Sequence, residues 1–437
     1  MKVTLDILPS ELREVVHQVS REGERLRVSV YLVGGIVRDV LLKRPNLDLD
    51  FVVEGDGIVF ADAVAHTLQG TVRRHRRFGT ATVMAGQFKV DIASARTEQY
   101  HASGSLPTVT FASLKEDLFR RDFTVNAMAR DIDPHRFGRL IDYYGGYDDL
   151  KAGRIRFMHA RSFLDDPTRI FRAIRFKERF KFAIEKKTFK HLKEAVDSDA
   201  LSYVHVHRIR DELMLLLEEP SPHACFSRVQ RWCGFDFVHP GYSFSAEAAE
   251  VFKQLGRSVS WYEACMHQHK LPRIQKSLVY LCAFAGGLSA RDREAFGARY
   301  GFRRHERDML NMIGNVDTLC RSLHKASVSP SGVYKIVKPL PIEMIVLLHA
   351  RSGHYPGRLR IRSRLEEYLK RYRDVHLTLK GEDLKKLKIQ PQLLYNTILT
   401  QLLYRKLDGY IHTQDDETTE ALRLFKRLTR SEGRRNI

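Results

Sequence analysis

The stretch from Tyr31 to Val53 constrains the fold more than any other part of the chain, because its residue pattern changes repeatedly within a short span. Residues 28–33 form a short apolar run that ends in Gly34-Gly35. A basic amphipathic segment, residues 36–43, follows, and a turn at Pro45-Asn46 leads into a second apolar run. This order predicts a strand, a glycine turn, a helix and a second strand.

The first half of this stretch has the features of a phosphate-binding site. A glycine pair between a strand and a helix exposes backbone N–H groups and lets a ligand approach the backbone closely. Arg38, one turn into the predicted helix, adds a fixed positive charge.

The second half carries two acidic side chains in otherwise apolar surroundings. Asp48 and Asp50 are two residues apart, so on a strand both carboxylates point to one face. They repel each other unless a cation lies between them, and Mg²⁺ held by carboxylates and substrate phosphates is the usual cation. A phosphate-binding turn followed by this pair indicates nucleotidyl or phosphoryl transfer, although the pair taken alone is equally consistent with a solvated strand face.

The size and charge of the chain indicate several domains and a polyanionic partner. Its 437 residues suffice for roughly two to four domains. The net charge of +20 favours nucleic acid as the partner, with a merely basic soluble protein or an acidic membrane surface as alternatives. No apolar run is long enough to span a membrane, so we expect no membrane partner.

The cysteines predict a reduced, cytoplasmic protein. Their number is odd, they are scattered, and none forms a C-x-x-C pair, which suits packed free thiols. They are Cys225, Cys233, Cys265, Cys282 and Cys320.

Short β-type segments predict a small mixed sheet that ends near residue 150. Asp91, in the last of these segments, is either a third carboxylate that faces the first two or an ordinary strand-end aspartate. Residues 94–112 have no strong periodicity, so we expect a loop long enough to move or to contact substrate. The expected helices are residues 8–24 and 58–68, and the expected strands are residues 71–76, 80–85 and 88–93.

Two arginine-rich stretches follow. Arg120-Arg121-Asp122 is a dense charged cluster whose arginines suit a triphosphate, with Asn126 one turn beyond Asp122. A surface helix with ion pairs is the alternative. Within residues 163–180, Asp165 or Asp166 begins a helix. Arginines at helical spacing on one side of it either form a solvated face or bind phosphates and base edges: Arg169, Arg172, Arg175 and Arg179.

The second half of the chain has the pattern of an all-helical region. From about residue 185 onward, apolar residues recur at three- and four-residue spacing. The basic segment 358–373 predicts an arginine-rich helix that contacts an RNA backbone.

Four segments together resemble the ordered motifs of the class II tRNA nucleotidyltransferases, a family that includes bacterial poly(A) polymerases. They are LVGGIVRD, DLDFVV, RRDFTVNAMA and DDPTRIFRAIRF, and the likeness covers about residues 28–215. The resemblance implies an α+β chain, in which a polymerase-β-type nucleotidyltransferase head with a mixed sheet precedes all-helical domains. The expected divisions are a catalytic head at 1–150, a neck that recognises the base at 151–220, a body at 221–345 and a tRNA-binding tail at 346–437.

The resemblance also implies an enzyme that adds C and A residues to tRNA 3′ ends without a template. It would use CTP and ATP, release pyrophosphate, and hold the acceptor and T arms of tRNA. Asp48 and Asp50 would bind the catalytic Mg²⁺ ions. The residues implied to bind the nucleotide are Gly34, Gly35 and Arg38 at the triphosphate, Arg121 with Asp122 and Asn126 beside it, Asp166 and Arg169 at the base, and Arg172 and Arg175 in support.

Two departures from the family pattern keep alternatives open. The base-reading motif begins Asp165-Asp166, where Glu-Asp is usual. The loop 94–112 lacks the basic residue before its proline that is common in enzymes that switch from C to A. The chain is therefore a full CCA-adding, a CC-adding or an A-adding enzyme, with a poly(A) polymerase as the nearest alternative activity. The alternative from a different functional class is a non-catalytic RNA-binding protein whose transferase head has lost its activity.

Overall fold

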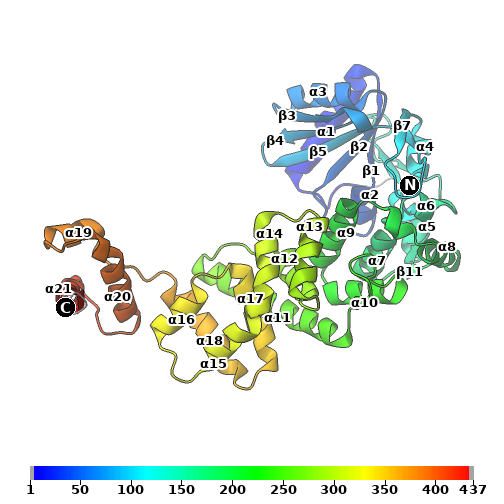
Figure 1. Ribbon diagram of the computed structural model, residues 1–437. Coiled ribbons are helices and arrows are strands. Elements are labelled where there is room, and N and C mark those ends of the chain that lie inside the picture. Colours follow the sequence, from blue (N-terminus) through cyan, green and yellow to red (C-terminus); the bar gives the residue numbers. More distant parts are fainter. Residues whose placement is uncertain (1–3, 433–437) are drawn as a thin grey trace. The chain divides into compact units, whose positions relative to one another are not determined.

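The computed structural model describes residues 4–432 and divides the chain into two compact units, Met1–Phe237 and Val238–Ile437. We describe each unit by itself (Figure 1). The finer domain limits expected at residues 150, 220 and 345 remain predictions.

The first unit is built on a mixed sheet of seven strands in the order β3-β4-β5-β2-β1-β8-β9. Strands β2 and β5 are parallel neighbours, whereas the other neighbouring pairs are antiparallel. The sheet confirms the predicted fold class. Its strands are β1 (Ser29–Val33), β2 (Leu49–Glu54), β3 (Thr71–His75), β4 (Thr80–Ala85), β5 (Phe88–Ser94), β8 (Ala129–Asp131) and β9 (Leu140–Ile141).

Helices lie on both faces of this sheet, but they leave part of one face open. Helices α1 (Ser10–Leu26) and α3 (Gly57–Thr67) pack together over one face, where α3 contacts β4 and β5. On the other face, α4 (Leu114–Phe119) packs its leucines against Tyr31, Val33 and Val52 of β1 and β2. Helix α2 (Gly35–Leu41) follows β1 directly, as the sequence predicted.

The prediction of an irregular loop at residues 94–112 is wrong. These residues contain a two-stranded hairpin, β6 (Arg96–Gln99) and β7 (Thr108–Phe111), paired from Arg96 with Phe111 to Gln99 with Thr108. The run Thr108-Val109-Thr110 is β-branched throughout, which favours a strand, but it is too short to give a clear period.

Helices complete the first unit. The stripe of apolar residues expected in residues 163–180 is present in α7, where Ile170, Phe171 and Ile174 are fully buried. These helices are α5 (Gly146–Lys151), α6 (Ser162–Asp165), α7 (Arg169–Phe180), α8 (Lys186–Asp197), α9 (Val206–Glu218) and α10 (Pro222–Trp232), with two short strands, β10 (Arg154–Ile155) and β11 (Ala183–Ile184).

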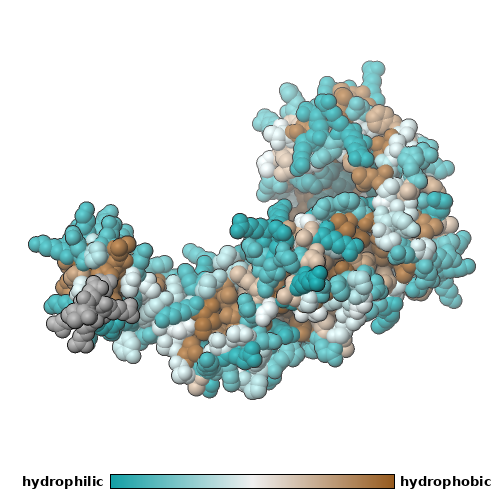
Figure 2. Space-filling view, in the orientation of Figure 1, coloured by the Kyte–Doolittle hydropathy of each residue, from teal (hydrophilic) through white to brown (hydrophobic). Residues whose placement is uncertain are grey.

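The described part of the second unit is all helical, as predicted. No helix within residues 4–432 has the length and apolar character needed to cross a membrane. Figure 2 shows hydrophilic side chains over most of the visible surface of each unit. The helices are α11 (Ala246–His269), α12 (Lys276–Ala285), α13 (Ala290–Arg299), α14 (Arg304–Met312), α15 (Val316–His324), α16 (Pro330–Val337), α17 (Ile342–Arg351), α18 (Arg358–Glu367), α19 (Gly381–Lys386), α20 (Tyr395–Leu407) and α21 (Gln414–Glu432).

Among the arginines of α18, which the sequence suggested as an RNA contact, Arg364 forms hydrogen bonds within the second unit. Arg364 donates from its two terminal nitrogens to four backbone carbonyls at and after the end of α15: those of Leu323, Lys325, Ala326 and Val328. A positive charge at the C-terminus of a helix satisfies carbonyls that have no partner within the helix. Arg364 therefore caps α15.

We expect Arg364→Ala to lower the free energy of unfolding of the second unit by about 2 kcal/mol, because several carbonyls lose a charged donor. Arg358→Ala is the matched control, since Arg358 lies exposed on the same helix. Hydrogen exchange of residues 316–328 in the full chain measures the effect. Equal protection in the two variants would contradict the capping role.

Candidate active site

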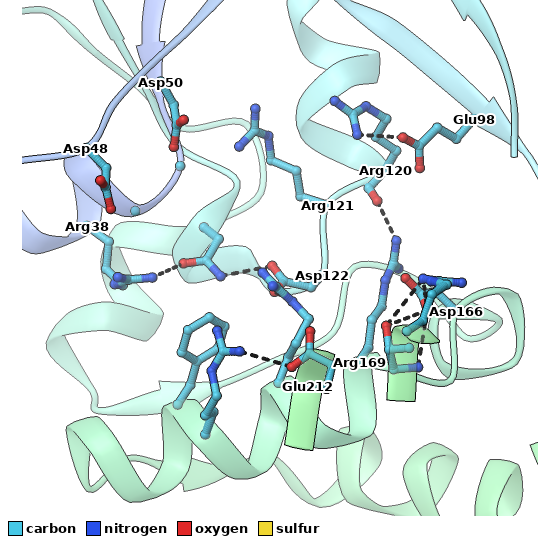
Figure 3. Close-up of a pocket in the computed structure, with 18 of the residues that line it drawn as sticks. Arg38, Asp48, Asp50, Glu98, Arg120, Arg121, Asp122, Asp166, Arg169 and Glu212 are labelled. Atoms are coloured by element: carbon cyan, nitrogen blue, oxygen red, sulfur yellow. Dashed lines mark hydrogen bonds and ion pairs between the residues drawn. The ribbon is translucent and has the colours of Figure 1, made fainter. Parts of the chain in front are cut away.

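A cavity of about 790 Å³ in the first unit brings together all the predicted site residues except Asp91. Its walls come from the glycine turn before α2, the start of β2, residues 120–126, α7 and α9 (Figure 3). The predicted residues that line it are Gly34, Gly35, Arg38, Asp48, Asp50, Arg121, Asp122, Asn126, Asp166, Arg169, Arg172 and Arg175.

The turn between β1 and α2 requires glycine for two reasons. Gly34 has a φ of 73°, a conformation that costs a glycine little. A Cβ atom at this position would lie 3.0 Å from Nη1 of Arg121 and 3.8 Å from Oδ2 of Asp50. The arginine and the carboxylate therefore converge over the turn, as Figure 3 shows.

The two predicted carboxylates face the cavity from slightly different backbone positions. Asp50 is the second residue of β2, whereas Asp48 lies exposed just before the strand and so is not part of it. Burial raises the pKa of Asp50, and the negative charges of Asp91 and Asp48 raise it further, against the opposing effect of Arg121. Neither Asp48 nor Asp50 forms an ion pair with any residue in 4–432. Carboxylates without a salt-bridge partner fit a hard divalent cation.

Asp91 lies beside Asp50 but opens into a different cavity. The two residues are register partners on β5 and β2. The Asp91 carboxylate accepts a hydrogen bond of 2.6 Å from the Thr82 hydroxyl and pairs with Lys89. Among the described residues, no three His, Cys, Asp or Glu side chains are grouped closely enough to hold a metal ion. A role for Asp91 as a third carboxylate remains a prediction.

A chain of polar contacts fixes the centre of the cavity. Arg38 is buried, donates to both carboxylate oxygens of Asp39 at 2.8 and 2.9 Å, and donates to the Asn126 amide oxygen. Asn126 donates at 2.9 Å to Asp122, which also accepts from Arg172 at 2.7 Å. These contacts join α2 to α7. They engage three nitrogens of Arg38, so its contact with a triphosphate remains a prediction.

Neighbouring side chains, rather than solvent, compensate the negative charge of Asp122 in this chain of contacts. Burial by itself would raise the pKa of Asp122, but Arg172, Asn126 and Arg169 outweigh it and lower that pKa to about 2. Asp122 is therefore an anion under all ordinary conditions, and it orients Arg172 and Asn126.

Hydrogen bonds hold one carboxylate oxygen of Asp166 and two nitrogens of Arg169, the predicted base-reading pair. One carboxylate oxygen of Asp166 accepts from the Thr168 backbone N–H at 3.1 Å, from the Thr168 hydroxyl at 2.7 Å and from Nη2 of Arg208 at 2.8 Å. Arg169 is buried and donates to the Ser162 hydroxyl and, at 2.7 Å, to the Arg120 carbonyl (Figure 3).

Arg208 also ties the hairpin β6–β7 to this pair. Its Nη1 donates at 3.2 Å to the carbonyl of Gly104, at the tip of the hairpin. The neighbouring Ser103 hydroxyl donates at 2.6 Å to the carbonyl of Leu164. The hairpin is thus fastened at its tip to the segment that carries Asp166.

Sequence reasoning missed a buried acid that holds two arginines of the cavity, and several residues that line the cavity. Asp117 is fully buried and accepts from Arg120 at 2.7 Å and from Arg121 at 3.0 Å. Burial would raise the pKa of Asp117, but Arg121 and Arg120 outweigh it and the net shift is downward. The three- and four-residue spacing of this acid before the two arginines was the available signal. The unassigned residues that do line the cavity and matter here are Glu98, Tyr100, Arg208 and Glu212.

Comparisons with known proteins find similar proteins over most of the chain. Residues 30–156 match the family model described as the poly A polymerase head domain. An A-adding tRNA nucleotidyltransferase of Halalkalibacterium halodurans is 31% identical, with 96% of this chain and 94% of that protein covered. One of Geobacter sulfurreducens is 34% identical over 95% of this chain, but this chain spans only 49% of that protein's length. The solved Thermotoga maritima CCA-adding enzyme with tRNA aligns at 31% identity and a TM-score of 0.72, covering 97% of this chain and 98% of that one.

The mixed sheet, the glycine turn and the facing aspartates define a nucleotidyltransferase. The full-length likeness is more specific, and the chain belongs to the tRNA nucleotidyltransferase family.

Proposed function

We propose that this enzyme adds the terminal adenylate to tRNA that already ends in CC, with ATP as the donor. Membership of the family supports transfer to a tRNA 3′ end. Of the three similar proteins described above, those of Halalkalibacterium halodurans and Geobacter sulfurreducens are named A-adding enzymes, whereas that of Thermotoga maritima is named a CCA-adding enzyme. The net charge of +20 suits a large RNA partner. Contact with the acceptor and T arms, and a cytoplasmic location, are parts of the same proposal.

The observation that carries the choice of a single kind of base is the fixed position of Asp166 and Arg169, and the names of the two A-adding relatives favour adenine. Adenine and cytosine each present an amino donor beside a ring-nitrogen acceptor on the edge used for pairing. An aspartate and an arginine therefore satisfy both bases equally, and only the position of the pair relative to the sugar separates a purine from a pyrimidine. An enzyme that adds both bases must move this pair between additions.

The contacts of the pair oppose such movement. Asp166 is held by Thr168 and Arg208, and Arg169 by Ser162 and the Arg120 carbonyl. The hairpin that the sequence suggested as a mobile loop is fastened to the same segment through Arg208 and Ser103. If Asp166 and Arg169 stay at one distance from the sugar of the nucleotide, they fit a base of one size. This supports addition of a single kind of nucleotide.

The remaining residues of the cavity have roles that follow from their positions. Asp48 and Asp50 would hold divalent cations, Mg²⁺ in this proposal, which supply a more acidic RNA hydroxyl and neutralise phosphate charge. Arg121, held at Asp117 with Nη1 over the glycine turn, would bind phosphate oxygens and balance the charge of the departing pyrophosphate. Arg172 would face the nucleotide from α7, positioned by Asp122.

The test is an extension assay on three tRNA transcripts, which end before CCA, after one C and after CC. Each is incubated with CTP, with ATP and with both. We expect a single adenylate on the CC transcript and no addition to the others. Stepwise addition of C, C and A would replace the proposal with a full CCA-adding enzyme, and long adenylate tails would replace it with a poly(A) polymerase.

A further inference from the structure

The second unit contains a cavity of about 360 Å³ that the proposed function does not use. Its walls come from α11, α12, α13, α15 and α17 and from the short 3₁₀ helix Ile313–Asn315, so it lies within a single unit. A volume of this size, with mostly apolar walls and a few polar groups, is typical of small-ligand sites. The side chains of its apolar wall are Ala248, Val251, Ala283, Ile313, Val316 and Leu347.

A buried arginine without an acidic partner lies in the wall of this cavity. Arg293 is only 8% exposed, and its Nη1 donates to the Leu288 carbonyl. Its Nε is enclosed and forms no hydrogen bond, and the guanidinium forms no ion pair, with any residue in 4–432. Nη2 lies 3.3 Å from the position that a Cβ atom at Gly314 would occupy, so this glycine leaves room beside it. A buried guanidinium favours an anion next to it, because an uncompensated buried charge is costly.

An acid without a basic partner lines the same cavity. Glu247 is exposed in the first turn of α11 and forms no ion pair within the described part of the chain. A hydrogen bond from the Ser245 hydroxyl and one from the Glu247 backbone N–H lower the pKa of this carboxyl, so it is an anion at neutral pH. The other two charged residues of the lining, Asp317 and Arg351, pair with each other at 3.5 Å. The lining therefore offers one cation and one anion that do not pair with each other.

These two charges favour a ligand that carries both signs. A simple carboxylate would satisfy Arg293 and leave Glu247 without a partner. A phosphate or an RNA strand would in addition bring further negative charge next to Glu247 and Asp317. A zwitterion satisfies Arg293 and Glu247 together, and the apolar wall then suits an apolar side chain.

We propose that this cavity binds an aliphatic α-amino acid, with its carboxylate on Arg293, its ammonium on Glu247 and its side chain against the apolar wall. The inference is independent of the proposed function, because it uses no residue of the catalytic cavity. The apolar side chains of the wall are all aliphatic, so leucine is a suitable probe.

The test is titration calorimetry of the full chain with leucine and with three analogues, each of which removes one proposed contact. Glycine lacks the apolar side chain, 4-methylpentanoate lacks the ammonium, and leucinamide lacks the carboxylate. We expect leucine to bind with a Kd below about 1 mM and each analogue to bind at least about tenfold more weakly, because each loses a charge-assisted hydrogen bond or apolar burial. Failure of leucine to bind, or equal binding of leucine and an analogue, overturns the inference.

Variants of the two charged residues test whether leucine binds in this cavity. Arg293→Met removes the charge and keeps a long side chain. Arg291→Met is the matched control, because Arg291 is exposed on the same helix and does not line the cavity. We expect the Kd for leucine to rise about 30-fold in Arg293→Met and about tenfold in Glu247→Gln, and to stay within about twofold in Arg291→Met. Unchanged binding by Arg293→Met, or an equal loss in Arg291→Met, overturns the inference.

If Arg293→Met fails to fold, Ala248→Leu decides. This substitution fills the cavity from α11 with a residue that favours a helix. Ala249→Leu is its control, because Ala249 is also half-buried on α11 but does not line the cavity. Ala248→Leu should raise the Kd for leucine at least about tenfold, since the ligand loses its space, and unchanged binding overturns the inference. Transfer to tRNA is assayed separately, and its absence in the wild-type protein would count against the proposed function alone.

Discussion

Asp50→Asn is expected to abolish nucleotide transfer, with a loss of at least about 10³-fold in kcat, while the protein remains folded. The carboxylate lines the cavity, and in the proposed role its replacement would remove one cation ligand and with it several kcal/mol of charge stabilisation at the reacting phosphate. Because Asp50 is partly buried beside two other acids, its neutral replacement relieves repulsion, and the Tm should not fall.

The matched control is Asp62→Asn. Asp62 carries the same group on α3 and does not line the cavity, and within residues 4–432 its one ion pair is with Arg74. Single-turnover transfer from α-labelled ATP to the CC transcript measures the effect, together with a thermal melt. Near wild-type transfer by Asp50→Asn would contradict the assignment of this carboxylate. A large loss in Asp62→Asn would show that the assay responds to the fold rather than to the site.

Arg208→Ala is expected to weaken the choice between ATP and CTP. Its guanidinium is the contact shared by Asp166, Thr168 and the Gly104 carbonyl, so its removal frees both Asp166, the acid proposed to read the base, and the hairpin tip. We expect kcat/KM for ATP to fall about 100-fold through misplacement of the base, and the ATP-to-CTP ratio to fall about tenfold.

Arg210→Ala is the control for Arg208. Arg210 lies on the same helix, but its side chain pairs with Asp211 and it does not line the cavity. The ratio is measured on the CC transcript with each nucleotide alone. If kcat/KM falls equally for ATP and CTP and the Tm is lower, Arg208 has a structural role and no role in the choice of nucleotide. Rescue of the ratio by Arg208→Lys would show that charge alone is sufficient.

The parts of the site that the sequence predicted are local ones. The turn at Gly34, the helix that carries Arg38 and the strand that carries Asp50 follow from periodicity and spacing within a few residues. The same is true of the arginine stripe on α7. Local patterns of this kind are determined by the backbone geometry of single elements, so they need no knowledge of the tertiary fold.

The parts that were missed depend on distant partners. The sequence does not indicate that Arg175 and Arg179 pair with Glu212 and Glu219, which lie 37 and 40 residues further along the chain. The same holds for Arg364, whose carbonyl partners precede it by 36 to 41 residues. The hairpin at residues 96–111 was missed because its strands are short and its register is fixed partly by contacts at its tip.

The central claim is that this enzyme adds one adenylate to tRNA ending in CC. The most direct measurement is the intact mass of that transcript after incubation with the protein, ATP, CTP and Mg²⁺ together. The account predicts a gain of one adenylate residue, with no cytidylate and no further growth on longer incubation. A product that contains added cytidylate, or several adenylates, would contradict it.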